Sequence, residues 1–258
     1  IDARAVYSCN NPLFDRLTSG KRVLYVFNKC DLVEKSDLDK WCAAFEAQGK
    51  RYVKAVGISG DCAAIVAGLK ETVADKLEKY RTKGASVSVR AMVVGVPNSG
   101  KSTIINAMCK KAKAITGDRP GVTKGKQWLS VDGVDFLDTP GTLWGKFEDG
   151  KVALHLAFIG SIRDEVLDTE ELACEFLSEV YPSCRKMFAE RYSIGEDLSS
   201  AVEVYEAIAA SRGFRLKGGE CDYSRTARAV IDDFRKGRIG KIMLEYPETS
   251  GLRLKNKG

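Results

Sequence analysis

The sequence has little histidine and no closely spaced cysteines. His155 is the single histidine, and the eight cysteines are dispersed, with no C-x-x-C pair. A zinc site needs clustered Cys and His ligands, and a His-based catalytic triad needs a nucleophile motif beside its histidine. The sequence therefore argues against both. Dispersed cysteines are typical of reduced thiols, so we expect a cytoplasmic protein, or one of an organelle matrix if the source is eukaryotic.

Long apolar runs are also missing. The longest, AMVVGV and VLYVF, are far shorter than the roughly 20 residues that cross a bilayer. We expect neither a secretory signal nor a membrane span. The content of 44% hydrophobic and 29% charged residues over 258 positions is typical of a globular protein with one large or two ordinary domains.

A phosphate-binding loop is the strongest motif present. Residues 95–102 read GVPNSGKS, which fits G-x-x-x-x-G-K-[ST], between a predicted strand and a predicted helix. Backbone N–H groups of such a loop surround phosphates, and a helix N-terminus adds positive potential. The lysine neutralises phosphate charge, and the serine hydroxyl suits Mg²⁺. The predicted nucleotide-binding residues here are Pro97, Asn98, Ser99, Gly100, Lys101, Ser102 and Thr103.

Two weaker motifs fit a nucleoside triphosphatase. DTPG at 138–141 ends an apolar strand, where Asp138 can hold a magnesium-bound water and the Gly141 N–H can contact a γ-phosphate. Thr123 lies in a polar stretch where a switch threonine can close on Mg²⁺. An ordinary Pro-Gly turn and an exposed loop threonine are the alternatives. We predict Lys101, Thr123 and Gly141 as catalytic residues and Ser102, Thr123 and Asp138 as Mg²⁺ ligands.

The tetrapeptide NKCD at 28–31 has the sequence with which GTP-binding domains recognise guanine. A carboxylate such as Asp31 accepts the N1–H and N2–H₂ donors of guanine, a pair that adenine lacks, so it selects against ATP. Asn28 can bond the other polar edge of the base or brace the loop, and the Lys29 stem can cover the ring. Ser59 and Gly60 end the next strand and can contact guanine O6 from the backbone.

These motifs occur in a permuted order, because guanine recognition precedes the phosphate loop. Strands alternate with helices, and the ends of a compact domain often lie close enough to be joined. The sequence therefore predicts an α/β fold: a circularly permuted P-loop GTPase domain with a mainly parallel sheet, followed by a small all-helical domain. We place the GTPase domain at 1–162, with one helix from 61 to about 83 joining its halves, and the helical domain at 163–258.

The expected helical domain has an uneven charge. Residues 168–211 carry 3 basic and 10 acidic side chains, whereas residues 212–258 carry 12 basic and 6 acidic ones. We expect helices over 169–181, 198–212 and 223–236, and a strand-like end at KIMLEY. A basic end favours a polyanionic partner, although a solvated face, or pairing with nearby carboxylates, is the alternative. The predicted RNA-facing residues are Lys217, Arg225, Arg228, Arg235, Lys236, Arg238 and Lys241.

Taken together, these motifs resemble the YlqF/RbgA family of permuted GTPases, called ribosome biogenesis GTPase A. DAR at 2–4 followed by Asn11-Pro12 resembles the family's opening, and NKCDL, GVPNSGKSTIIN, RPGVTKGKQW, DTPG and DFRKGRIGKIMLEYPE follow in its order. The resemblance spans nearly the whole chain. It implies GTP/GDP and Mg²⁺ as ligands. It also implies action in late maturation of the large ribosomal subunit, whose precursor particle (rRNA and ribosomal proteins) would be the partner and would stimulate hydrolysis. We expect a monomer.

Two departures from the family pattern, and one further residue, affect what the resemblance implies. Family members usually begin with a Gly-His-Met segment and a strand, so we expect the sheet to lack most of one strand here. Thr142 stands where many GTPases have a water-orienting glutamine, so slow intrinsic hydrolysis is expected. Asn98 resembles the asparagine of potassium-activated GTPases, which gives K⁺ as a further expected ligand.

Other functions fit parts of the same sequence. An ATP-dependent P-loop enzyme such as a kinase would require Asp31 to be incidental. A nucleotide-gated binding module would use hydrolysis only to reset itself. The basic end could bind another RNA or an anionic surface instead of a ribosomal particle.

Overall fold

The computed structural model describes residues 1–10, 14, 17–59, 63–85, 87–116, 128–143, 147 and 149–248. It divides into two compact units, Ile1–Lys146 with Glu245–Gly258, and Phe147–Leu244. This division differs from the one expected after residue 162 in two respects. The helix before that point belongs to the second unit, and the chain from Glu245 onward belongs to the first.

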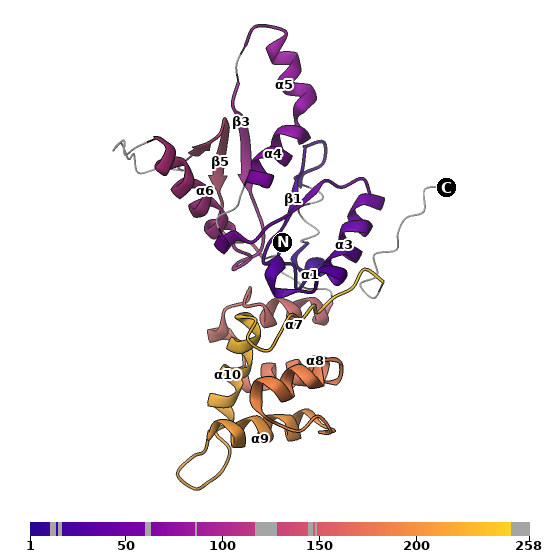
Figure 1. Ribbon diagram of the computed structural model, residues 1–258, viewed down its shortest axis with the longest axis vertical. Helices are drawn as coiled ribbons and strands as arrows, with labels where there is room; N and C mark the ends of the chain where they lie inside the picture. Colours follow the sequence, from indigo (N-terminus) through magenta and orange to yellow (C-terminus); the bar gives the residue numbers. More distant parts are fainter. Residues whose placement is uncertain are drawn as a thin grey trace. The chain divides into compact units, whose positions relative to one another are not determined.

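Parallel strand pairs build the first unit (Figure 1). Strand β1 (Tyr25–Phe27) pairs in parallel with β2 (Tyr52–Lys54). Strand β3 (Val89–Val93) pairs in parallel with β5 (Val134–Asp138), whose other edge pairs antiparallel with β4 (Trp128–Val131). The mainly parallel sheet predicted from the alternation of strands and helices is confirmed, although the strands are shorter than the apolar runs that predicted them.

The described helices of the first unit lie between these strands in the sequence, except α1, which precedes β1. They are α1 (Val6–Cys9), α3 (Lys35–Ala47), α4 (Ala63–Thr72), α5 (Ala74–Arg81) and α6 (Lys101–Thr116), with short 3₁₀ turns η1 (Cys30–Leu32) and η2 (Gly57–Ser59). The single helix expected over 61–83 is interrupted at Val73. Two β-branched residues meet there, and the Thr72 hydroxyl donates to the Gly68 carbonyl at 2.6 Å. Both features weaken a continuous helix.

Apolar side chains from α4, α6 and β5 form the core that fixes the phosphate loop. Ile65 and Val66 of α4 pack in one cluster with Ile104, Ile105 and other residues. Spacings of one, three and four residues place these side chains on one face of each helix. Because α6 is anchored by that face, its first turn, which follows the phosphate loop, has a fixed place beside the sheet.

The second unit is helical, as predicted. It contains α7 (Gly150–Phe158), η3 (Asp164–Val166), α8 (Thr169–Tyr192), α9 (Ala201–Arg212) and α10 (Tyr223–Arg235). The expected end of the first long helix at 181 is wrong, because α8 continues through Pro182 and kinks at Cys184, where φ is −123°. A proline removes one helical N–H and bends a helix without always ending it. The strand-like end expected at KIMLEY is also wrong, since residues 241–246 form no strand.

Aromatic rings fill the centre of this helical unit. Phe176 of α8 lies with its ring centroid 4.7 Å from that of Phe234 and 5.2 Å from that of Phe158. All three side chains are buried. Ring contacts of this kind add stability beyond the burial of apolar area.

Among the described residues, no helix combines the length and the apolar character needed to cross a membrane.

Glu245, which belongs to the first unit, is bonded to α1 and to Trp41. The buried Glu245 carboxylate accepts hydrogen bonds from the N–H groups of Tyr7, at 2.7 Å, and Ser8, at 3.0 Å, and from the Ser8 hydroxyl. The Glu245 carbonyl accepts the Trp41 indole N–H at 2.9 Å. A carboxylate accepts hydrogen bonds from the free N–H groups at the start of a helix. Its negative charge is also stabilised there by the positive end of the helix dipole. Glu245 thus fixes α1, which follows residues 2–4 directly.

Replacement of Glu245 by alanine should lower the free energy of unfolding of the first unit by about 2–3 kcal/mol, because buried N–H groups of α1 lose a charged acceptor. Chemical denaturation followed by Trp fluorescence measures the change. Glu248→Ala is the matched control, since Glu248 is exposed, and should change stability by less than about 0.5 kcal/mol. Equal effects of the two substitutions would contradict the anchoring role.

Candidate nucleotide-binding site

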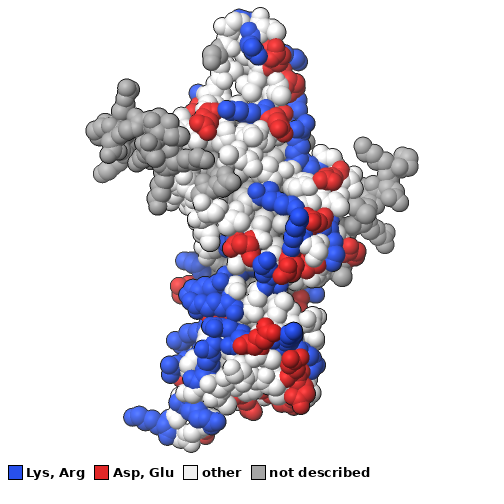
Figure 2. Space-filling model, in the orientation of Figure 1, with Lys and Arg blue, Asp and Glu red and all other residues white. Residues whose placement is uncertain are grey.

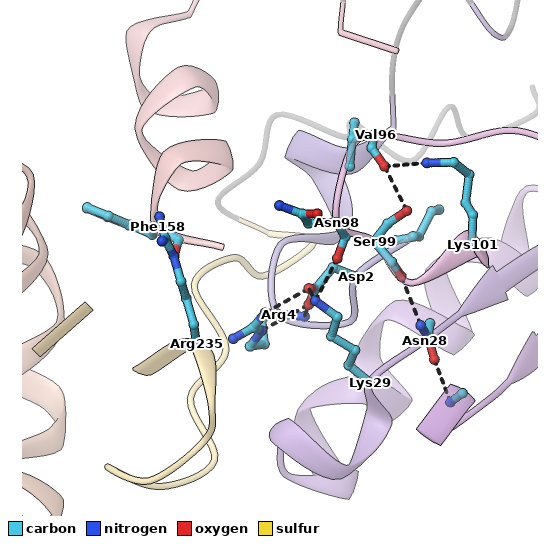
Figure 3. Close-up of polar contacts among 12 residues, drawn as sticks. Asp2, Arg4, Asn28, Lys29, Val96, Asn98, Ser99, Lys101, Phe158 and Arg235 are labelled. Atoms are coloured by element: carbon cyan, nitrogen blue, oxygen red, sulfur yellow. Dashed lines mark hydrogen bonds and ion pairs between the residues drawn. The ribbon is translucent and has the colours of Figure 1, made fainter. Parts of the chain in front are cut away.

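The phosphate loop joins β3 to α6, as the motif predicted, and is closed by its own polar groups (Figure 3). Lys101 is a buried residue, with 9% of its surface exposed. Its ammonium donates to the carbonyls of Gly95 at 3.1 Å and Val96 at 2.8 Å. The Ser99 hydroxyl donates to Val96 at 2.9 Å. Burial lowers the pKa of Lys101, and the Asp138 carboxylate partly opposes this shift. A phosphate in the loop would offer this ammonium a charged acceptor in place of two neutral carbonyls.

Two predicted Mg²⁺ ligands meet at the edge of the loop. Ser102, in the first turn of α6, donates its hydroxyl to the Asp138 carboxylate at the end of β5, with 3.0 Å between the oxygens. Both side chains are exposed. Hard oxygen donors from a helix start and a strand end suit Mg²⁺, so this pair fits the ion. The third predicted ligand, Thr123, lies outside the described residues.

The DTPG turn lies against the phosphate loop. The Thr139 hydroxyl donates to the Val93 carbonyl at 2.6 Å, and the Thr142 N–H donates to the Gly95 carbonyl at 3.2 Å. Between them, Gly141 approaches so closely that a Cβ there would lie 2.6 Å from Pro97 Cα and 3.0 Å from Lys101 Nζ. Glycine is required by this approach of two backbones. The structure therefore brings together two motifs that lie far apart in the sequence.

Asn28 connects the NKCD loop to two other loops. Its amide nitrogen donates to the Ser99 carbonyl at 2.8 Å, and its amide oxygen accepts the Gly57 N–H at 2.9 Å. The side chain is 3% exposed by residue. The nitrogen of the amide thus bonds the backbone of the phosphate loop, and its oxygen bonds the backbone of η2. Of the two roles open for Asn28 in the sequence, these contacts favour the brace over a direct bond to a base.

Lys29 and Asp31 occupy the outer side of the same loop. Lys29 has φ of 60°, in the left-handed region, and its ammonium donates to the Asn98 carbonyl at 2.8 Å. Asp31, in η1, is exposed, as is Ser59 at the end of η2. This exposure leaves the Asp31 carboxylate accessible for a pair of donors on a base. Gly60, the other predicted support for guanine, lies outside the described residues.

Sequence reasoning missed Asp2 and Arg4 as parts of this site. Asp2 is fully buried, and its carboxylate pairs with the Arg4 guanidinium at 2.8 Å and with the Lys29 ammonium at 2.9 Å. Burial alone would raise the pKa of Asp2, but Arg4 and Lys29 outweigh burial and hold the pKa well below its usual range. The signal in the sequence was DAR itself, since two opposite charges within three residues can form an ion pair. Spacing alone gave no reason to connect them with Lys29.

The remaining predicted loop residues lie where the motif placed them. Pro97 and Gly100 are partly buried, whereas Asn98 and Thr103 are exposed. Gly100 has φ of +92°, and a Cβ there would lie 2.1 Å from the Asn28 amide nitrogen. A side chain at this position would therefore separate the phosphate loop from the NKCD loop.

The predicted RNA-facing residues divide into two groups in the helical unit. Arg235 is bonded internally, to the Phe158 carbonyl at 3.0 Å, the Ala157 carbonyl at 2.8 Å and the Asp164 carboxylate at 2.8 Å. These bonds explain the placement of α10 beside α7, and we remove Arg235 from the RNA-facing set. The others are exposed, although Lys236 pairs with Asp232, and Arg238 with Asp232 and Asp233. The exposed members are Lys217, Arg225, Arg228, Lys236, Arg238 and Lys241.

Histidine and cysteine form no second centre in the described part of the chain. His155 is buried in the helical unit and lies 2.8 Å from the Glu179 carboxylate. No group of three or more His, Cys, Asp or Glu side chains that could hold a metal ion occurs among the described residues.

Known proteins are similar to this chain in sequence and in fold. Residues 90–175 match the family model described as "50S ribosome-binding GTPase". Over 257 residues the chain is 39% identical to ribosome biogenesis GTPase A of Bacillus cereus, an alignment that covers 97% of this chain and 86% of the relative. The chain belongs to the ribosome biogenesis GTPase A family. The resemblance inferred from the motifs is confirmed, and so is the circularly permuted GTPase fold.

Solved structures of this family agree. The GDP-bound structure of TM YlqF is 28% identical and superposes with a TM-score of 0.67, covering 96% of this chain and 92% of that one. GNP-bound YlqF from T. maritima is 29% identical, with a TM-score of 0.66 and coverage of 96% and 90%. As a member of the ribosome biogenesis GTPase A family, the protein is a GTPase that uses GTP and GDP, generally with Mg²⁺.

Gly141→Ala should lower GTP turnover by about tenfold or more, because a methyl group would push the DTPG turn off the phosphate loop and misplace its N–H. Turnover at saturating GTP and Mg²⁺ measures the effect. Gly150→Ala is the control, since no heavy atom lies within 4 Å of a Cβ at that position. Wild-type turnover in Gly141→Ala would contradict the placement of this turn.

Proposed function

We propose that the protein binds Mg²⁺-GTP through the NKCD and phosphate loops and acts in late maturation of the large ribosomal subunit. The bond from Asn28 to the Ser99 carbonyl carries this proposal, because it joins the motif that reads guanine to the motif that holds phosphates. Asp31 selects guanine, the Lys29 stem covers the ring, and Ser59 with Gly60 supports O6. Lys101 neutralises phosphate charge, and Thr123 and Gly141 respond to the γ-phosphate.

Hydrolysis in this proposal is slow until a ribosomal particle supplies help. Thr142 follows the DTPG turn and has no side-chain amide that could orient a water molecule. Its backbone N–H is already bonded to the Gly95 carbonyl. A K⁺ ion beside Asn98 would add positive charge near the phosphates, the role that an arginine finger has in other GTPases. Ser102 and Asp138 would hold Mg²⁺. We place the protein in the cytoplasm, as a monomer.

The partner in this proposal is the precursor of the large subunit, contacted through its RNA. Figure 2 shows Lys and Arg gathered on the side of the helical unit where α10 and the loop before it lie. Arg225 lies over the Phe214 ring, 4.4 Å from its centroid, which holds the guanidinium at the surface. Lys217 is exposed in the preceding loop, and Arg228 is exposed one turn further along α10. Positive charge on one face is the electrostatic feature that RNA phosphates select.

GTP turnover should rise by about tenfold or more when purified large ribosomal subunits are added in KCl, because an external group completes the site. Small subunits are the control and should leave turnover unchanged. Replacing KCl by NaCl at equal ionic strength should lower the rate. Tight GTP binding without stimulation would favour a nucleotide-gated binding module, and equal rates in the two salts would contradict the K⁺ site.

Joint replacement of Lys217, Arg225 and Arg228 by glutamine should weaken binding to large subunits and lower the slope of log affinity against log salt by about 1–2 units. Intrinsic GTP turnover should not change. Lys186→Gln is the matched control, because Lys186 is an exposed cation on α8, within the acidic part of the sequence. An unchanged salt slope in the triple variant would contradict RNA binding through this face.

A further inference from the structure

A buried carboxylate lies beneath the loop proposed to recognise guanine. Residues 1–3 extend along the end of β1: the Ile1 carbonyl accepts the Asn28 N–H at 2.8 Å, and the Asn28 carbonyl accepts the Ala3 N–H at 2.9 Å. This pairing places Asp2 directly beside the NKCD loop, in a parallel bridge with Asn28. The Asp2 backbone is therefore held by hydrogen bonds of its two neighbours, Ile1 and Ala3.

The carboxylate has more partners than its own charge requires. Arg4 donates to it through Nε at 3.0 Å and through Nη2 at 2.8 Å, and the Arg4 backbone N–H adds a bond at 3.1 Å. A bidentate guanidinium already satisfies a buried carboxylate. The Lys29 ammonium makes an additional contact with the same Asp2 at 2.9 Å (Figure 3). The ion pair therefore has a further consequence, which is the placement of Lys29.

The placement of Lys29 determines the conformation of the base-recognition loop. Its ammonium contacts both the Asp2 carboxylate and the Asn98 carbonyl of the phosphate loop. The end of the Lys29 side chain is therefore fixed by both groups. Its backbone has φ of 60°, a conformation that costs a non-glycine residue energy. An ion pair with a buried carboxylate, at the end of the side chain, opposes relaxation of that backbone. Asp31 lies two residues further on, in η1, whose N-cap is Lys29.

We propose that Asp2 is a positioning residue for guanine recognition: by holding the Lys29 ammonium, it fixes the loop that presents Asp31 to the base. Arg4 holds the Asp2 carboxylate in place. This inference rests on the proposed role of Asp31 and Lys29 in guanine binding. It assigns a role in base selectivity to the DAR sequence, whose residues do not themselves reach the surface, since Asp2 and Arg4 are no more than 1% exposed.

The ratio of affinities for GDP and inosine diphosphate tests this role. Inosine diphosphate lacks the exocyclic amine, so the ratio reports how well Asp31 is aligned with that donor. Wild-type protein should prefer GDP by about tenfold or more, as a hydrogen bond to a charged acceptor predicts. Asp2→Asn should lower the ratio by about threefold or more. In a Lys29→Met background, Asp2→Asn should lower the ratio no further, because the two residues act through one contact.

A purely structural role would give a different result. If Asp2→Asn only lowered the fraction of folded protein, both affinities would fall by the same factor and the ratio would not move. Asp233→Asn is the matched control, since Asp233 is also a buried, ion-paired aspartate but lies in the helical unit. It should lower the melting temperature and leave the ratio unchanged.

A second variant keeps the test independent of folding. If Asp2→Asn alone does not fold, joint replacement of Asp2 by asparagine and Arg4 by methionine removes both charges, which buried sites tolerate better than the loss of one. The ratio should fall as before. An unchanged ratio in these variants, together with loss of selectivity in Asp31→Ala, would overturn the role of Asp2 and leave the proposed function intact. An unchanged ratio in Asp31→Ala would overturn both.

Discussion

The side chain of Asn28 is the contact on which the nucleotide site depends. One amide bonds the Ser99 carbonyl and the Gly57 N–H, so it fixes the phosphate loop and the loop after β2 relative to the end of β1. A buried amide with both ends bonded is costly to disturb, because any movement leaves polar groups without partners. A permuted chain needs such a contact. In the described part of the chain, α4 and α5 join its two halves, and the loops proposed to share a nucleotide come from both halves.

The positive charges around the site are also held in place by neighbouring groups. The phosphate loop carries Lys101, and the loop beside it carries Lys29, so two cations lie close to the place where phosphates are proposed to bind. Lys101 is balanced locally by carbonyl oxygens, whereas Lys29 is balanced by the buried carboxylate of Asp2. Each ammonium is thereby fixed before a nucleotide arrives, which lowers the ordering cost of binding. Glu245 anchors α1 next to this arrangement, and so connects the end of the described chain with its beginning.

Much of this could be predicted from the sequence, for physical reasons that differ from element to element. The phosphate loop and NKCD have fixed spacings set by the ligand, so their residues and order predicted the permuted fold. Helices were predicted well where apolar periodicity was strong, but Pro182 did not end α8, and Val73 interrupted the helix that joins the halves. Arg235 looked like a surface cation, although its partners come from residues about seventy positions earlier. Long-range partners such as Asp2 with Lys29, and Glu245 with α1, leave no local pattern and required the fold.

Competition between ATP and labelled GDP tests most directly the claim that a loop near the start of the chain reads guanine. Unlabelled GDP and GTP should displace the label at concentrations near their dissociation constants. ATP should fail to displace it even at about a thousandfold higher concentration, because the Asp31 carboxylate would face a base without the matching pair of donors. Displacement by ATP at concentrations similar to those of GDP would contradict the account. It would make NKCD an ordinary turn beside the loop of an ATP-binding enzyme.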